Sequence, residues 1–161
     1  MKRKLLFSLI PLTLVITIVL ATPAQSRREA EVFDLVNQQR MKAGLNALAW
    51  DDRVGGVARE YSRQMARENF FDHYDPEGND VMDRADRAKL TGWVKIGENL
   101  FACSPTPDFS RKAVVGWMNS ETHRVNILDR EWTSTGIGIA TARDGSIYVT
   151  QVFTRDSRGA K

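Results

Sequence analysis

The chain has 161 residues, of which 42% are hydrophobic and 27% charged, a composition typical of one globular domain with a sizeable core. Its single cysteine excludes an intramolecular disulfide, a zinc site built from several thiolates and a CxxC redox pair. The net charge of +3 comes from Lys2, Arg3 and Lys4, since 20 basic and 20 acidic residues remain once residues 1–24 are set aside. Such a balance gives no electrostatic reason to expect a nucleic acid as partner.

Residues 1–26 have the three parts of an export signal, which are a positive start, an apolar stretch over residues 5–21 and small residues behind it. Small residues permit cleavage after Ala21, Ala24 or Ser26. The alternative is an uncleaved anchor, because about 17 apolar-leaning residues reach the lower limit of a membrane span. In both cases we expect residues 27–161 to form one domain outside the cytoplasm, secreted or held in the periplasm or cell envelope.

The first half of the mature chain has the apolar spacing of two amphipathic helices. The first is predicted over residues 28–43, with Gly44 at its C-terminal cap. The second begins at Asp51 or Asp52 and ends at Asn69, and its apolar face comprises Val54, Val57, Ala58, Tyr61 and Met65. Residues 70–80 contain the Pro, Gly and Asn residues of a structured loop.

The second half changes from helical to strand periodicity. Asp80 is predicted to cap a short helix that ends near Lys89, residues 96–101 form a brief strand, and a further helix with Val114, Trp117, Met118 and Glu121 on one face begins at Ser110. Alternating apolar residues on both sides of Asp144 and Gly145 predict a terminal hairpin with a two-residue turn. The pattern therefore indicates an α+β domain, with helices packed on a small antiparallel sheet.

Three side chains are candidates for acid–base or metal chemistry. His73 and His123 are the only histidines, and Glu98 stands in an otherwise apolar segment where an uncompensated carboxylate is costly to bury. Glu98 lies 25 residues from each histidine, so no local metal motif exists and the fold would have to bring the three together. If they converge, they suit a zinc site with an open position or, equally, a hydrogen-bonded cluster without metal.

Two further side chains invite a nucleophile hypothesis. Ser120 precedes His123 by three residues, but no G-x-S-x-G elbow surrounds it, so a hydrogen-bonding role at a helix end is favoured. Cys103 is interpreted as a small buried apolar residue in preference to a reactive thiol.

Four motifs in order resemble the CAP superfamily of cysteine-rich secretory, antigen 5 and pathogenesis-related proteins, in its short bacterial SCP-like form. The resemblance covers residues 29–155, and it rests on the segments His73–Gly78, Gly97–Leu100, Trp117–Leu128 and Tyr148–Phe153. It implies a three-layer α-β-α sandwich with a central cleft and an exported location.

In the larger family the cleft holds two His and two Glu. His73 matches the first His, and Glu98 matches the acid of the Gly-Glu-Asn motif. The second acid falls on Ser120 and the second His on Tyr148, while Thr150 and Gln151 match the rest of that motif. The pattern Ser-x-x-His-Arg-x-Asn of bacterial members is present instead, as Ser120, His123, Arg124 and Asn126.

The resemblance leaves three functions open. The first is an exported monomeric binding module whose cleft, with Ser120, Tyr148 and Gln151 near its rim, binds an extracellular or envelope ligand such as a lipid, a peptide or a cell-wall component. This module would need no cofactor, or it would bind its ligand through zinc or another divalent metal held by His73, His123 and Glu98. It would contact a membrane only through an uncleaved signal. The second is a metal-dependent, protease-like hydrolase with Glu98 as ligand or general base. In the third, the polar cluster only holds the loops together and ligands bind on the outer surface.

Overall fold

A computed structural model describes residues 25–157, so the predicted export signal lies almost entirely outside the described residues. The elements in chain order are α1 (Arg27–Lys42), β1 (Ala49–Trp50), α2 (Asp52–Glu68), α3 (Val81–Arg87), β2 (Trp93–Cys103), α4 (Phe109–Asn119), α5 (Glu121–Leu128), β3 (Ser134–Thr141) and β4 (Ile147–Asp156). Within residues 25–157, no helix combines the length and the apolar character that crossing a bilayer requires.

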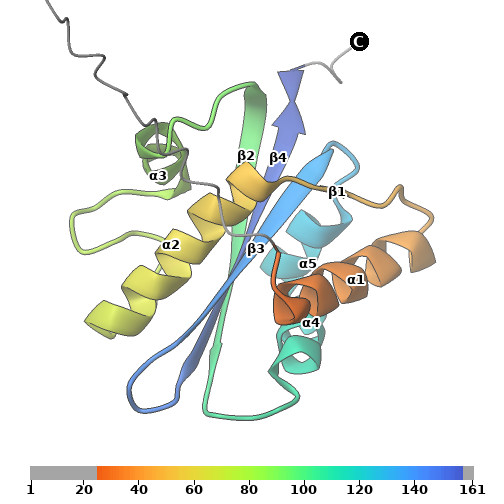
Figure 1. The fold of residues 1–161 in the computed structure, drawn as a ribbon. Coiled ribbons are helices and arrows are strands. Elements are labelled where there is room, and N and C mark those ends of the chain that lie inside the picture. Colours follow the sequence, from red (N-terminus) through yellow and green to blue (C-terminus); the bar gives the residue numbers. More distant parts are fainter. Residues whose placement is uncertain (1–24, 158–161) are drawn as a thin grey trace, which may run out of the picture.

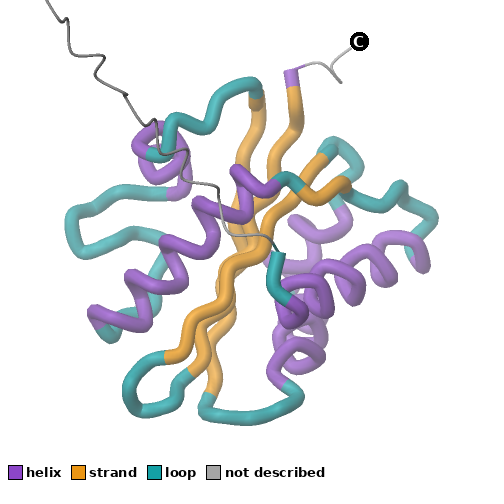
Figure 2. Tube along the Cα trace, viewed as in Figure 1, coloured by secondary structure: helices purple, strands orange, loops and turns teal. Residues whose placement is uncertain are grey.

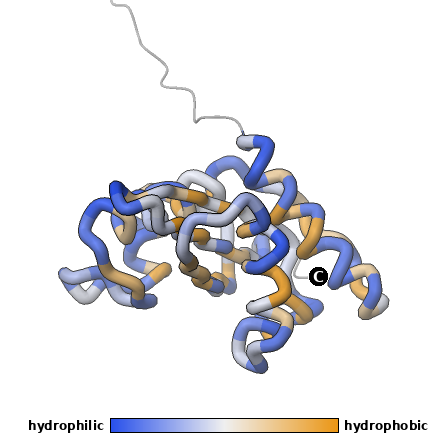
Figure 3. The backbone as a smooth tube through the Cα atoms, turned by 90° about the horizontal axis from the view of Figure 1, so that it is seen from below, coloured by the Kyte–Doolittle hydropathy of each residue, from blue (hydrophilic) through white to orange (hydrophobic). Residues whose placement is uncertain are grey.

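The strands form one twisted sheet in the order β1-β3-β4-β2, with helices on both faces (Figures 1 and 2). One core lies between the sheet and the helices α1, α4 and α5, and includes Val36, Trp117, Ile127 and Phe153. Two smaller clusters join the opposite face to α2 and α3. Many of the hydrophobic stretches accordingly run along the central strands in Figure 3, while the hydrophilic stretches gather at the periphery. The predicted three-layer α-β-α sandwich is thereby confirmed.

The boundaries of α1, α2 and α3 agree with the sequence pattern to within one or two residues, and the capping residues predicted for α2 and α3 are present. The Asp51 side chain accepts from the backbone of Arg53 and Val54 at the start of α2. Asp80 forms a capping box with Asp83 at the start of α3. Asn69, with a φ of 56°, ends α2 in the left-handed conformation.

Three details of the sheet differ from the sequence prediction. The segment read as a tether before Asp51 contains β1, which pairs with β3 in parallel, and a two-residue strand is too short to show alternation. β2 extends beyond residues 96–101 because β4 pairs with it over almost its whole length. The hairpin turn has three residues and not two, since Ala142 N donates to Ser146 O across it. Gly145, the last of the three turn residues, has a φ of 86°.

Close packing of α2 against β3 depends on two glycines. A Cβ atom at Gly136 would lie 2.1 Å from the backbone nitrogen of Gly55, and one at Gly138 would lie 2.1 Å from the backbone carbon of Ala58. Ser62 reinforces the contact by donating to Gly138 O at 3.0 Å. The position of α2, and of the loop that follows it, is therefore fixed against the sheet.

Candidate functional site

The edge strand β2 brings the predicted site residues together from both faces of the sheet. Glu98 pairs with Val152 and Asn99 with Gln151, so these two neighbours point to opposite faces. Glu98 faces the layer of α2 and α3, which carries His73 in the loop between them. Asn99 faces the layer of α4 and α5, which carries His123. We call His73, Arg84, Glu98, Ser120 and His123 the histidine site.

On the first face, a buried carboxylate lies between two nitrogen donors. Glu98 Oε1 is 2.8 Å from His73 Nδ1, and Arg84 Nη2 donates to Glu98 Oε2 at 2.7 Å. The side chains of Glu98 and Arg84 are 4% and 6% exposed, whereas that of His73 is 52% exposed. With Glu98 ionised, Nδ1 of His73 is its donor, and the imidazole is left with Nε2 for other partners.

The loop that carries His73 is held by a chain of hydrogen bonds. Arg84 Nη1 donates to His73 O at 3.1 Å and to Asn79 O at 2.9 Å. The buried Asp75 carboxylate accepts from the backbone and the side chain of Asn79, both at 2.8 Å. The hydroxyl of Tyr61 donates to Asp72 O at 2.5 Å, and the Arg84 guanidinium lies 3.3 Å above the Tyr61 ring. His73 is therefore presented by an ordered loop.

On the second face, the helix predicted from Ser110 is broken at Ser120. The extended backbone of Ser120, with a ψ of 125°, ends α4 and begins α5. The Ser120 side chain makes no cap hydrogen bond, and its Oγ lies 2.9 Å from His123 Nδ1. Trp117 Nε1 donates to Leu100 O at 2.8 Å and so fixes α4 on β2.

Neutral amides fix the backbone around His123. Asn99, which is fully buried, donates from Nδ2 to His123 O at 3.1 Å. Asn126 donates from Nδ2 to Asn99 Oδ1 at 3.0 Å and to Glu98 O at 3.2 Å. Two consecutive residues of β2 therefore each anchor one of the two histidines, Glu98 through its carboxylate and Asn99 through its amide.

The surroundings shift the pKa values of the two imidazoles in opposite directions. The hydrogen bond to Glu98 raises the pKa of His73 above its usual value. Burial lowers the pKa of His123, and the positive charge of His73 lowers it further. The two histidines thus interact electrostatically although they lie on opposite sides of a strand.

The donor set of this site does not fit a metal ion. Within residues 25–157, no group of three or more His, Cys, Asp or Glu side chains is arranged to hold a metal ion. Both carboxylate oxygens of Glu98 already accept hydrogen bonds, and the guanidinium of Arg84 places a positive charge where a cation would bind. The three side chains expected as zinc ligands instead form a hydrogen-bonded pair, His73 with Glu98, and a separate His123.

Two residues expected at the rim of a cleft lie inside the molecule. Gln151 is fully buried, because it lies on the central strand β4 beside Asn99 of β2. Its side chain donates to Thr135 Oγ1 at 3.2 Å. Tyr148 is 7% exposed and packs against Tyr61, Met65 and Leu100. Tyr148 precedes Val152, the pairing partner of Glu98 on β4, by four residues, which is about 13 Å along the strand. The central cleft itself remains a prediction.

The sequence reasoning missed Arg84, which binds the site's carboxylate, and assigned no role to Asn99. Nothing in the local pattern of α3 distinguishes Arg84 from its neighbours, whereas Asn99 and Asn126 stood in the motifs quoted above. Cys103 is partly buried beside the larger core, and burial raises the pKa of its thiol, as expected of a packing residue.

Comparison with known proteins adds sequence and structural relatives. The model of the cysteine-rich secretory protein family, CAP, matches residues 33–153. The Bacillus subtilis protein YkwD is 34% identical over 131 residues, which are 81% of this chain and 49% of that protein. The Bacillus subtilis membrane protein YlbC is 32% identical over 134 residues, which are 81% of this chain and 35% of that protein.

Among solved structures, an extracellular protein containing an SCP domain from Bacillus anthracis is 35% identical and has a TM-score of 0.68. The similarity covers 80% of this chain and 40% of that protein. The chain therefore spans about half or less of the length of these three relatives.

Proposed function

Because the chain belongs to the cysteine-rich secretory protein (CAP) family, we propose that it is an exported binding protein whose histidine site recognises a ligand outside the cell or in the cell envelope. The Bacillus anthracis relative is described as extracellular, and residues 1–26 have the pattern of an export signal. Both observations support export.

The observation that carries the binding proposal is the half-exposed His73 held on a buried ion pair. Glu98 and Arg84 fix the orientation of the imidazole, and the loop hydrogen bonds fix its backbone. A ring held in this way binds a polar group without losing rotational freedom at the moment of binding. The raised pKa of His73 favours its protonated form, in which Nε2 donates a hydrogen bond.

Two exposed aromatic residues belong to the loop that carries His73. Phe71 and Tyr74 stand on either side of His73 in the same loop and are 52% and 59% exposed, and the Phe71 ring lies 6.5 Å from that of Tyr148. Exposed rings of this kind supply apolar contact area. The proposed ligand accordingly has a hydrogen-bond acceptor for His73 and an apolar part for the neighbouring rings, as lipids, peptides and cell-wall glycans have.

A second candidate function is hydrolysis, favoured by the 2.9 Å contact between Ser120 Oγ and His123 Nδ1. The lowered pKa of His123 keeps that imidazole neutral, as a general base requires. A hydrolase of this kind would act without metal, because the donor set does not fit one.

Co-sedimentation tests the binding proposal. We would incubate the full-length chain with purified peptidoglycan and with phosphatidylglycerol vesicles, and compare it with His73→Ala and with Gln38→Ala. Gln38 is exposed on α1, away from the histidine site, and serves as the control. We expect His73→Ala to lose binding to the probe that the parent chain binds, with Gln38→Ala unchanged.

Three results separate the proposals. Equal binding by the parent and by the double variant His73→Ala, His123→Ala would place the ligand on another surface. No binding of either probe by the parent would contradict envelope recognition. Turnover of an ester or peptide substrate that disappears in Ser120→Ala would favour the hydrolase.

A further inference from the structure

Three arginines are almost completely buried, and one of them has no carboxylate partner. Arg59 Nε lies 2.9 Å from Glu29 Oε1, and Arg84 Nη2 lies 2.7 Å from Glu98 Oε2. Arg40, on the last turn of α1, is only 1% exposed and forms no ion pair within the part of the chain that the structure describes. A buried charge without a direct ion pair is costly, and the Asp129 carboxylate offsets the cost of burying Arg40 only in part, since the pKa of Arg40 is still lowered.

Backbone carbonyls satisfy part of this guanidinium. Nε donates to Asn46 O at 2.9 Å, and Nη1 donates to Ile127 O at 2.7 Å and to Asp129 O at 2.8 Å. These acceptors carry only partial charges, and burial lowers the pKa of Arg40. The second terminal nitrogen, Nη2, donates to no group among residues 25–157.

Arg40 lines a pocket of about 530 Å³ that contains a second cation. The residues that line it belong to the segments after α1 and after α5, and the segment after α1 forms the right-hand edge of Figure 1. Arg130 also lines it and is exposed, without an ion partner in the described residues. No acidic residue is among those that line it, which are Gly44, Leu45, Asn46, Ala47, Trp132 and Thr133 besides the two arginines.

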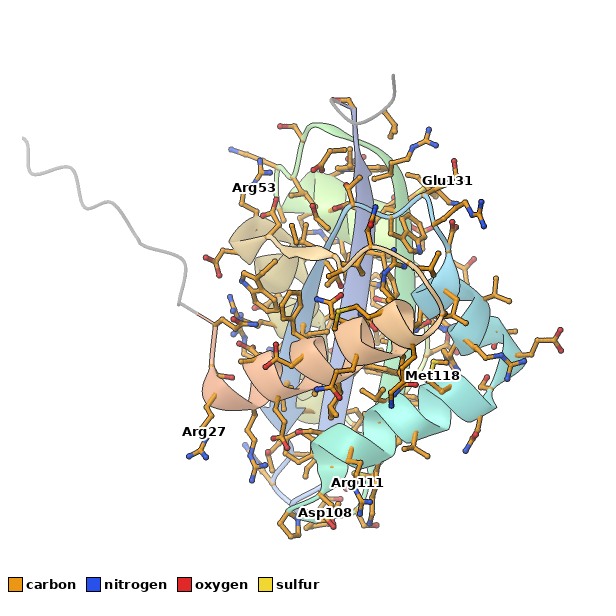
Figure 4. The ribbon with its side chains drawn as sticks, turned by 90° about the vertical axis from the view of Figure 1, so that its right-hand side faces the viewer. Arg27, Arg53, Asp108, Arg111, Met118 and Glu131 are labelled. Carbon is orange, nitrogen blue, oxygen red and sulfur yellow. The ribbon has the colours of Figure 1, made fainter. Side chains whose placement is uncertain are left out.

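Backbone N–H donors also lie in the pocket lining. The backbone N–H groups of Asn46 and Ala47 lie in an exposed segment and donate to no group among the residues that the structure describes, whereas Asn46 O already accepts from Arg40. The neighbouring Asp129 does not neutralise the pocket, because its carboxylate accepts from Lys95 at 2.5 Å and from Glu131 N at 2.8 Å. Glu131 itself is labelled in Figure 4 and lies in the segment between α5 and β3.

We propose that this pocket, the Arg40 pocket, binds a phosphate group, either as a free phosphate or as the phosphodiester of an envelope headgroup. Two guanidinium groups and two free N–H groups match the several acceptor oxygens of a tetrahedral anion, which accepts more hydrogen bonds than a carboxylate. The bound anion would place a negative charge in direct contact with Arg40, which interacts with the Asp129 carboxylate without forming an ion pair. The pocket shares no residue with the histidine site, so this proposal is independent of the proposed function.

Two-dimensional NMR of the ¹⁵N-labelled full-length chain tests the proposal. Inorganic phosphate and, separately, glycerophosphoglycerol would be titrated at pH 7 and constant ionic strength, following the amides of Asn46 and Ala47 and the side chain of Arg40. Arg130→Gln removes the exposed cation without touching the buried one. Arg143→Gln is the matched control, since Arg143 is exposed in the hairpin at the other end of β3.

We expect a saturable shift confined to the Arg40 pocket, with an affinity about tenfold weaker in Arg130→Gln and unchanged in Arg143→Gln. If inorganic phosphate saturates the shifts, a free phosphate is sufficient as the ligand. If only glycerophosphoglycerol saturates them, the ligand is the phosphodiester of a headgroup. Shifts spread over all exposed Lys and Arg residues, equal affinity in the two variants, or no saturation with either probe would each overturn the proposal.

Discussion

The two histidines flank the same edge strand, but His73 lies among charged groups and His123 among neutral ones. Glu98 and Arg84 form a buried ion pair beneath His73. His123 contacts a hydroxyl through its ring and an amide through its backbone. One strand thus builds two different environments with two consecutive residues, because Glu98 and Asn99 point to opposite faces.

This difference predicts that removing contacts around His73 lowers the free energy of unfolding more than removing contacts around His123. Removing one partner of a buried ion pair leaves a charge without compensation, whereas removing an amide leaves a neutral group without a partner. Removing a partly exposed hydroxyl should cost least, since water replaces it. The three variants that follow compare these cases in order.

Glu98→Gln should have the largest effect. The substitution leaves the 6% exposed Arg84 guanidinium without a counter-charge, so we expect the free energy of unfolding to fall by about 3 kcal/mol. Chemical denaturation measures the change, with Glu121→Gln as an exposed control on α5. A loss no larger than that of the control would contradict the assigned role of the ion pair.

Asn126→Ala should have an intermediate effect. It removes the donor to Asn99 Oδ1, which is buried, and to Glu98 O. We expect a loss of about 1 to 3 kcal/mol in the same denaturation experiment. Asn119→Ala, an exposed asparagine at the end of α4, provides the comparison and should be nearly neutral.

Ser120→Ala should have the smallest effect. Its side chain does not cap α5, so only its contacts with His123 and with the exposed Thr122 hydroxyl are lost, and we expect about 0.5 kcal/mol. Ser26→Ala removes a genuine capping box from α1 and should cost about 1 kcal/mol. A larger loss at Ser120 than at Ser26 would show that the hydroxyl supports the fold in a way that the cap geometry does not reveal.

Periodicity and capping residues were sufficient to predict most of the fold. Asp51, Asp80 and Asn69 mark helix ends because their side chains or backbone conformations satisfy unpaired backbone groups locally. The two-residue strand β1 and the break at Ser120 could not be predicted. The pairing of β1 with β3 is not local, and Ser120 continues an apolar helical spacing on both sides.

Most members of the histidine site were predictable from the sequence, but Arg84 was not. His73, Glu98 and His123 were singled out by residue type, and the structure places all three at β2. The presence of Arg84 beside Glu98 depends on how α3 packs on the sheet, and this contact gives the buried carboxylate a direct counter-charge. Gln151 was expected at a rim but is fully buried, because β4 is a central strand and helices cover both faces of the sheet.

The opposed pKa shifts also predict opposed contributions to stability. The raised pKa of His73 stabilises the fold fully below the ordinary histidine value, and that stabilisation is lost as the pH rises through the raised value. The lowered pKa of His123 gives stability that is present above the ordinary value and is lost as the pH falls through the lowered one. The two effects partly cancel in overall stability, so each residue has to be titrated separately.

The most direct test is an NMR titration of the two imidazole Cε1 protons in the full-length chain, assigned with His73→Gln and His123→Gln. We predict that His73 titrates above 6.5 and His123 below it, and that Glu98→Gln lowers the pKa of His73. Two histidines that titrate together near 6.5, unaffected by Glu98→Gln, would contradict the account that one edge strand holds them in a charged and a neutral environment.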